Sequence, residues 1–481
     1  MKKRIMSKSE KISEKIGHGW ASRFVTSFLL IAVLLFGGSQ SSRATQAGKP
    51  QVRNEPPQQT VQSVVAKQAS LVSEFEVNGL KVLMKRREGS LTVSAGLFIR
   101  GGAANINSGN AGIESLMLSA STEATSGFPR EKMRSELSRM GTIIGSSATN
   151  DYSVLSLGCT RMYFDRSWQL FSDVILRPSF TKEDVALVQD RAVVALSDDT
   201  DNPDVYLQKL QEKVAYAGHP YLNDTDGTPE TIAKLTPEDL RQYHDKVMET
   251  SRLLLVIVGD LNAADVRDLV ASSFGKLPRG NYKAEPMPAL VFDKSSVDVT
   301  PRDLPTNYVQ GFFAAPSLTS PDIYAMRVAS SLLRDRVFEE VRVKRNLSYA
   351  PDAFLRNQAA NVGGLYVTAV DANQSVRLML NEIAKLQQQP VRAEEIQAVV
   401  AQYLTQYYMG QETNAAQAVE LAQYELIGGG WRTSTDFLEK LTAVTPTDVQ
   451  RVAQKYMRNI RFVVLGNPQS VDTGVFMGQA E

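Results

Sequence analysis

The sequence predicts an α+β fold in which one unit of strands followed by helices is written twice. Each repeat begins with strand-like alternation and continues into helical periodicity. Each then ends with a helix that starts at Thr-Pro and with a short apolar strand that ends in Gly. The Thr-Pro starts at Thr236 and Thr445 are 209 residues apart, and the strand ends at Gly259 and Gly466 are 207 apart. The nearly equal offsets indicate that the same fold is encoded twice.

Both Thr-Pro helices carry well-defined start signals. The sequences are Thr236-Pro237-Glu238-Asp239 and Thr445-Pro446-Thr447-Asp448. Each places a capping hydroxyl, a proline at the first helical position and an early carboxylate together. The apolar segments that follow, Leu253–Gly259 and Phe462–Gly466, are predicted to be strands.

The composition is that of an ordinary folded protein and excludes several functional classes. The chain has 481 residues, of which 43% are hydrophobic and 22% charged, which is sufficient for two or more domains. The net charge of +1 argues against a nucleic-acid partner. The single cysteine, Cys159, excludes an intramolecular disulfide and lies in the alternating run Tyr152–Thr160. We therefore predict a small buried strand residue, with a reactive thiol as the alternative.

The first 47 residues have the order of a secretory signal. Basic residues precede the apolar run Phe24–Gly38, and small residues follow it up to Ala47. The run is shorter than the ~20 residues that comfortably span a bilayer, which favours cleavage and export, most simply to a bacterial periplasm. The long basic segment leaves membrane anchoring by residues 24–38 as the alternative. Residues 48–69, rich in Pro and Gln, are predicted to be a disordered spacer.

The segment from Gly112 to Pro129 resembles the active-site helix of a zinc peptidase family. It fits the pattern G-x-x-H-x-x-E-H…G-T-x-x-[YF]-P of the insulinase/pitrilysin/mitochondrial-processing-peptidase family, but Ser115, Leu118 and Ser119 stand where that family has His, Glu and His. Such a site needs two imidazoles at i and i+4 and a carboxylate that takes a proton from the zinc-bound water. Serine and leucine supply neither function.

The third zinc ligand of the family is also replaced. Asp190-Arg191 resembles the family's Glu-Arg pair, and Ser197 stands where the ligand glutamate follows seven residues later. The resemblance therefore implies that this chain has no catalytic residue and no metal of its own.

Further segments resemble the family in order and spacing over residues 70 to 470. They are Asn78–Val82, Leu91–Gly102, Met140–Leu155 and His219–Ile232. The resemblance implies two homologous domains, each an antiparallel sheet packed with helices, which together form half of a peptidase clamshell. We expect these domains at residues 70–277 and 291–470, joined by a Pro-rich linker at 278–290 and followed by a tail at 471–481.

The second half contains a segment that resembles the substrate-binding segment of the family. Arg336–Tyr349 resembles the family pattern R-L-F-x-x-[LV]-R-x-x-x-G-L-x-Y, in which Arg342 and Tyr349 match the pair that binds substrate. A guanidinium and a phenol can both stabilise an oxyanion as it forms. Asn346 replaces the family's glycine, and asparagine also tolerates the left-handed turn that ends a helix. From the residues alone, the alternative is that Arg342 belongs to a solvated basic cluster.

Other motifs give weaker indications. Outside the leader, only His219 and His244 remain, and neither has a second imidazole at helical ligand spacing. His219 resembles a structural turn residue of the family. No G-x-S-x-G motif surrounds Ser115 or Ser119, and no Gly-rich phosphate loop precedes a lysine.

The resemblance implies a non-catalytic, substrate-binding subunit of an exported zinc metallopeptidase. Such a subunit forms a heterodimer with a zinc-bearing homologue, which holds the zinc, and supplies Arg342 and Tyr349 for hydrolysis of peptides. Family members bind an extended peptide as an added strand at a sheet edge. The first alternative is a structural or peptide-binding subunit with no role in proteolysis. The second is an independently active peptidase whose metal ligands lie elsewhere. Membrane contact is expected only if the leader is not cleaved.

Overall fold

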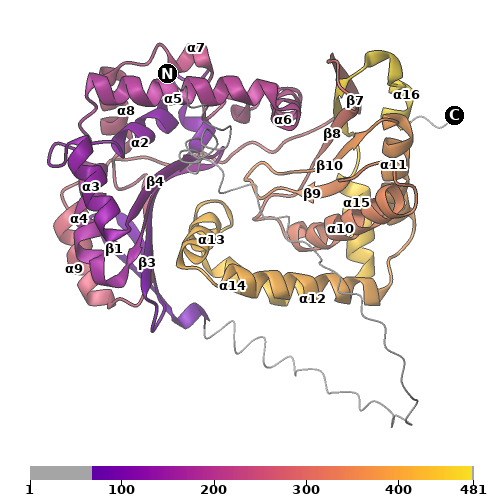
Figure 1. Cartoon of the computed structure of the whole chain (residues 1–481). Helices are drawn as coiled ribbons and strands as arrows, with labels where there is room; N and C mark the ends of the chain where they lie inside the picture. Colours follow the sequence, from indigo (N-terminus) through magenta and orange to yellow (C-terminus); the bar gives the residue numbers. More distant parts are fainter. Residues whose placement is uncertain (1–67, 479–481) are drawn as a thin grey trace, which may run out of the picture. The chain divides into compact units, whose positions relative to one another are not determined.

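The computed structural model describes residues 68–478, apart from the side chains of residues 198–200. The predicted leader at 1–47 and nearly all of the predicted spacer at 48–69 lie outside the described residues. The described chain belongs to one compact unit, Gln58–Glu481, and contains two β-sheets with their helices (Figure 1). No helix among residues 68–478 is both long and apolar enough to cross a membrane.

The first sheet has six strands in the order β1-β2-β6-β3-β5-β4. Their bounds are β1 Val72–Val77, β2 Leu80–Arg86, β3 Thr92–Arg100, β4 Ile143–Ala148, β5 Tyr152–Thr160 and β6 Leu253–Gly259. The helices of this half are α2 Ile113–Ser121, α3 Arg130–Met140, α4 Phe164–Leu176, α5 Lys182–Asp201, α6 Pro203–Ala215, α7 Pro229–Ile232, α8 Pro237–Val247 and α9 Ala263–Phe274. Short 3₁₀ turns lie at Gly102–Asn105, Arg161–Tyr163 and Pro220–Leu222.

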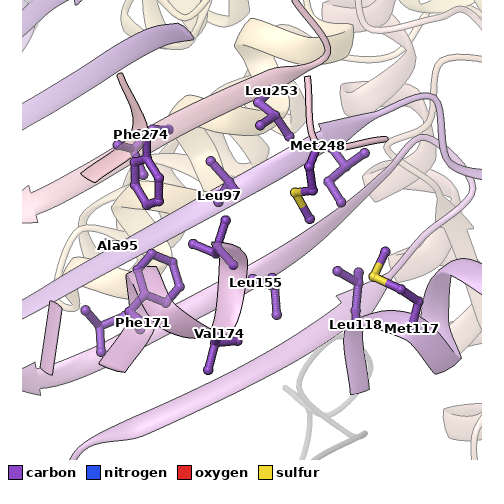
Figure 2. Packing of buried hydrophobic residues seen from close by; sticks show 14 of the residues in the cluster. Ala95, Leu97, Met117, Leu118, Leu155, Phe171, Val174, Met248, Leu253 and Phe274 are labelled. Carbon is purple, nitrogen blue, oxygen red and sulfur yellow. The ribbon is translucent and has the colours of Figure 1, made fainter. Parts of the chain in front are cut away.

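One face of this sheet packs against helices of the same half. Leu97 of β3 and Leu155 of β5 lie in one buried cluster with Phe171 of α4, Phe274 of α9 and Leu118 of α2 (Figure 2). Cys159 belongs to the same cluster and is buried, so the prediction of a small buried strand residue is confirmed.

The second sheet has five strands in the order β7-β11-β8-β10-β9. Their bounds are β7 Ser296–Pro301, β8 Asn307–Ala314, β9 Asp352–Leu355, β10 Val362–Ala369 and β11 Arg461–Gly466. The helices are α10 Asp322–Val337, α11 Ala372–Gln388, α12 Ala393–Gly410, α13 Asn414–Ile427, α14 Arg432–Thr442, α15 Pro446–Tyr456 and α16 Thr473–Phe476. A π-helical turn, η4 at Phe338–Val343, extends α10, and a 3₁₀ turn lies at Pro468–Ser470.

The α+β class is confirmed, and the two sheets repeat one topology. In each half the last strand lies between two early strands: β6 pairs parallel with β2 and antiparallel with β3, and β11 pairs parallel with β7 and antiparallel with β8. The remaining pairs are antiparallel, so each sheet is mixed rather than purely antiparallel. The parallel pair arises because the last strand returns after helices rather than through a hairpin.

The predicted starts of the two Thr-Pro helices are confirmed. Thr236 Oγ1 accepts a hydrogen bond from Asp239 N at 3.2 Å, and Thr445 Oγ1 accepts one from Asp448 N at 3.2 Å. In both cases the aspartate also accepts from the threonine N–H, which completes a capping box. The capped helices α8 and α15 each precede the last strand of their sheet.

Each sheet packs its second face against a helix of the other half. Phe98 and Leu254 of the first sheet are buried with Leu421 of α13. Val463 of the second sheet is buried with Leu207 of α6. Because these apolar clusters contain residues of both halves, the halves stabilise one another.

Candidate substrate-binding site and degenerate zinc site

Helix α2 starts at a position that strongly favours glycine. Gly112 is its N-cap residue, with a φ of 86° in the left-handed region. A Cβ there would lie 2.6 Å from Ile232 Cδ1 and 2.8 Å from Asp226 O. Gly227 lies opposite Gly112 with a φ of 81°, and a Cβ there would lie 2.8 Å from Ala111 O. The start of α2, the helix predicted to resemble the family's zinc helix, is therefore held in a fixed conformation.

The three replaced positions on α2 have different surroundings. Ser115 Oγ donates to Asp226 Oδ1 at 3.4 Å, and Ser119 Oγ lies 3.4 Å from Ser146 Oγ of strand β4. Leu118 is fully buried in the core of the first half (Figure 2). The two serines thus occupy the half-exposed face of the helix, and the position of the family's catalytic base is part of the apolar core.

Helix α5, which carries the predicted third ligand position Ser197, packs beside α2. Arg191 NH1 of α5 donates to Glu123 Oε1, just after α2, at 2.5 Å. Ser197 Oγ donates to Val193 O of its own helix at 2.8 Å. Across the described residues, no three His, Cys, Asp or Glu side chains are grouped so that they could hold a metal ion. The helical frame is kept, but its side chains do not fit zinc.

Sequence reasoning missed a buried carboxyl group on α2. Glu114 is 3% exposed, and its Oε2 accepts from Tyr243 Oη of α8 at 2.6 Å and from Asn105 Nδ2 at 3.3 Å. Burial raises the pKa of this carboxyl group. The available signal was a glutamate among apolar residues in the first turn, but a first-turn glutamate also stabilises a helix from an exposed face. Its contacts fix α2 against α8.

The structure brings Arg342 and Tyr349 together. The guanidinium carbon of Arg342 lies 4.4 Å from the ring centroid of Tyr349, and Arg342 NH1 donates to Asn346 Oδ1 at 3.2 Å. Asn346 has a φ of 50°, which confirms the predicted left-handed turn. The π-helical turn before it is closed by the bond from Lys344 N to Glu339 O at 2.9 Å.

The charges around this pair distinguish Arg342 from its basic neighbours. Lys344 Nζ and Arg345 NH1 each lie 2.5 Å from a carboxylate oxygen of Glu340. No carboxylate within residues 68–478 forms an ion pair with Arg342, and Tyr349 is 72% exposed. The guanidinium and the phenol are therefore both available to an external acceptor.

Strand β4 provides a sheet edge beside Ser119 of α2. It is the outermost strand of the first sheet and pairs with β5 from Ile143 to Ala148. Ser146 of this strand is the neighbour of Ser119. The outer backbone groups of an edge strand can pair with an extended peptide.

Both remaining histidines have structural contacts. His219 Nδ1 accepts from Tyr221 N at 3.1 Å, and its Nε2 lies 2.9 Å from Pro288 O, as expected for a turn histidine. His244 is buried, and its Nε2 lies 2.8 Å from Ile175 O.

Two family models match the chain. The model described as insulinase (peptidase family M16) matches residues 81–228, and the model described as peptidase M16 inactive domain matches residues 234–403. A Helicobacter pylori protein described as "non-peptidase homolog YmxG" is 25% identical over 305 residues, 61% of this chain and 69% of that protein. The mitochondrial-processing peptidase subunit beta of Blastocladiella emersonii is 23% identical over 413 residues, 81% and 87% of the two chains.

Solved structures show the same fold. A protease from Helicobacter pylori superposes with a TM-score of 0.76 at 19% identity, covering 82% of this chain and 99% of that one. A peptidase M16 inactive domain from Pseudomonas fluorescens superposes with a TM-score of 0.75 at 20% identity, covering 82% and 98%.

Proposed function

Because the chain belongs to the insulinase (peptidase M16) family, we propose that it is the non-catalytic, substrate-binding subunit of an exported peptidase whose zinc is held by a homologous partner. The observation that carries this proposal is a contrast between the two halves. Ser115, Ser119 and Ser197 cannot bind zinc, whereas Arg342 is half-buried against the exposed Tyr349 and has no described carboxylate partner.

The chemistry of the Arg342–Tyr349 pair suits a peptide carbonyl. A guanidinium and a phenol are hydrogen-bond donors, and both become stronger partners when the carbonyl oxygen acquires negative charge. The cation–π contact and the bond to Asn346 restrict the guanidinium before substrate arrives. A restricted donor loses less conformational freedom on binding, which favours transition-state stabilisation.

The edge of β4 supports a peptide partner of varied sequence. A peptide that adds as a strand is held mainly by backbone hydrogen bonds, and these are shared by all sequences. The residues of β4 are Ile143, Ile144, Gly145, Ser146, Ser147 and Ala148. Four of these side chains are small, so an added strand meets little steric hindrance.

A subunit role fits the relatives named above, and one of them favours the alternative. The Blastocladiella relative is by name one subunit of a peptidase. The Helicobacter relative is by name a non-peptidase. A structural or peptide-binding subunit without a role in hydrolysis is therefore the second candidate.

The test is reconstitution with a homologue from the same genome that has an intact H-x-x-E-H motif. We expect the two chains to co-elute and the pair to cleave a quenched fluorescent peptide much faster than the homologue alone. Chelation of zinc should abolish this activity without separating the chains, because this chain contributes no metal ligand. Full activity of the homologue alone, unchanged on adding this chain, would reject the proposal.

A further inference from the structure

The two most exposed large apolar side chains of the described residues lie together at one end of the first sheet. Leu91, just before β3, is 82% exposed, and Met162, just after β5, is 79% exposed. Their segments are joined by the bond from Arg161 N to Leu91 O at 2.8 Å. Single exposed apolar residues are common, but two such residues side by side indicate a surface with a partner.

The end of helix α12 adds two more apolar side chains to this place. Tyr408 and Met409 are 47% and 58% exposed. The turn that follows them is bonded to the sheet end: Asn414 Nδ2 donates to Thr92 O at 2.6 Å, and Lys85 Nζ donates to Gln411 Oε1 at 3.1 Å. We call Leu91, Met162, Tyr408 and Met409 the tip surface.

Arginines surround the tip surface. Arg86 Nε and Arg161 Nε donate to Asp260 at 3.3 and 3.0 Å, and Arg87 NH1 donates to Asn414 Oδ1 at 2.9 Å. Arg86 and Arg161 are exposed even with these bonds. An apolar centre with guanidinium groups at its border suits a surface that is apolar inside and carries phosphates outside.

The amino-terminal end of the described chain enters the fold at this same place. Arg86 N donates to Leu71 O at 2.9 Å, and Val72, the first residue of β1, pairs with Lys85. Figure 1 shows the first described residues and the start of β3 at the same end of the sheet. The sequence that precedes this point contains the apolar run Phe24–Gly38. If the predicted leader is not cleaved, a membrane that holds this run is joined to the fold through the chain that enters beside the tip surface.

We propose that the tip surface binds the interfacial region of a phospholipid bilayer. Leu91, Met162 and Met409 enter the boundary between head groups and acyl chains, and the hydroxyl of Tyr408 stays at the level of the head groups. The neighbouring arginines contact lipid phosphates. Binding of this kind is peripheral and requires no membrane-spanning helix. It is independent of the proposed role in proteolysis.

The test is flotation of residues 58–481 with lipid vesicles. This segment includes both sheets and every buried cluster among the described residues, so it retains the whole core. Vesicles of phosphatidylcholine with about 30% phosphatidylglycerol supply an anionic bilayer. We expect the protein to float with these vesicles. The double substitution Leu91→Asp/Met162→Asp should reduce the bound fraction about tenfold or more, because a carboxylate is excluded from the apolar boundary.

Two controls separate this surface from non-specific binding. Val370→Asp replaces an equally exposed apolar residue, 74% exposed, at the end of β10 and should float like the unsubstituted protein. Leu91→Ala/Met162→Ala should weaken flotation without adding charge. Failure of the unsubstituted protein to float, or equal losses in Val370→Asp and Leu91→Asp/Met162→Asp, would overturn the proposal. So would loss of partner co-elution, rather than of flotation, in the tip variants, since the surface would then be a protein interface.

Discussion

The guanidinium of Arg342 lies over the ring of Tyr349 at 4.4 Å, while its neighbours Lys344 and Arg345 are both paired with Glu340. The segment therefore contains two kinds of basic residue. Two share the carboxylate of Glu340, and one lies over an exposed phenol. The residues alone left open the alternative that Arg342 belongs to a solvated basic cluster. That alternative does not predict that Arg342 differs from Lys344 and Arg345 in its contacts.

Tyr349→Phe tests whether the pair acts in hydrolysis. The substitution removes one hydrogen-bond donor and keeps the ring that packs against Arg342. We expect turnover by the reconstituted pair to fall on the order of 10²–10³-fold, as for loss of one oxyanion donor. Co-elution with the partner and peptide affinity should change little. The measurements are steady-state cleavage and gel filtration.

Tyr408→Phe is the matched control for that experiment, because Tyr408 is also exposed but lies at the end of α12. It should leave turnover unchanged. If Tyr349→Phe also leaves turnover unchanged in a normally assembled complex, the shared-site mechanism is rejected. A structural or peptide-binding subunit would then be the better account.

The chain alone is predicted to bind no stoichiometric zinc and to cleave no peptide. Restoring the α2 motif with Ser115→His, Leu118→Glu and Ser119→His should still fail, because a catalytic zinc site of this type uses three protein ligands and Ser197 remains. The structure adds a second obstacle, since Leu118 is fully buried and a carboxylate there loses its hydration. Elemental analysis after dialysis is the measurement. About one zinc per unsubstituted chain would contradict the prediction.

Zinc binding is expected from a variant in which only the three ligand positions are substituted and the position of the catalytic base is left unchanged. Ser115→His/Ser119→His/Ser197→Glu supplies two imidazoles and a carboxylate on helices that still pack together, and leaves Leu118 in the core. This variant should retain zinc after dialysis, and the same variant without Ser197→Glu should retain less. Equal zinc content in the two would show that α5 does not lie at the position the family alignment implies.

The elements that sequence predicted best are those specified locally. The caps at Thr236 and Thr445 and the left-handed Asn346 depend on a few adjacent residues, and the structure confirms all three. The duplication also follows from the sequence, because both copies kept the same spacing. The confirmed fold class rests on these features and on the family resemblance.

The features that sequence could not predict depend on residues far apart in the chain. The packing of α13 on the first sheet and of α6 on the second joins segments that share no local pattern. Burial of Glu114 likewise depends on Tyr243, which lies on another helix. The role of Arg342 and Tyr349 and the predicted domain boundaries remain predictions, because geometry alone does not test them.

Ionisation of one carboxyl group between the halves, that of Asp151, is expected to lower the stability of the protein as pH rises. Asp151 accepts from Tyr221 Oη and, at 3.3 Å, from Ala359 N of the second half, and burial raises its pKa to about 6. Because the pKa in the folded state is above the value of 3.8 in the unfolded state, the folded state binds more protons in this range. The stabilisation is thus present at low pH and lost as pH rises through about 6.

Asp151→Asn isolates this contribution, because asparagine keeps an acceptor for Tyr221 but does not titrate. Between pH 5 and pH 7 the free energy of unfolding of the unsubstituted protein should fall by on the order of 1 kcal/mol more than that of the variant. Urea unfolding at both pH values is the measurement. Parallel pH dependence in the two proteins would show that Asp151 does not titrate in this range.

Gly112→Ala should destabilise the protein through two separable effects. The first is the left-handed backbone, with a φ of 86°, which costs a residue with a side chain roughly 1–2 kcal/mol. The second is steric, because the new methyl group would lie 2.6 Å from Ile232 Cδ1 and 2.8 Å from the backbone oxygen of Asp226. Gly141→Ala supplies the matched control: its φ is 61°, and nothing lies within 4 Å of the added Cβ. Urea unfolding should therefore show a moderate loss for Gly141→Ala and a clearly larger loss for Gly112→Ala. Equal losses would mean that the loop around Asp226 moves readily to accept the added methyl group. The crowding at Gly112 would then not explain why the start of α2 keeps its position.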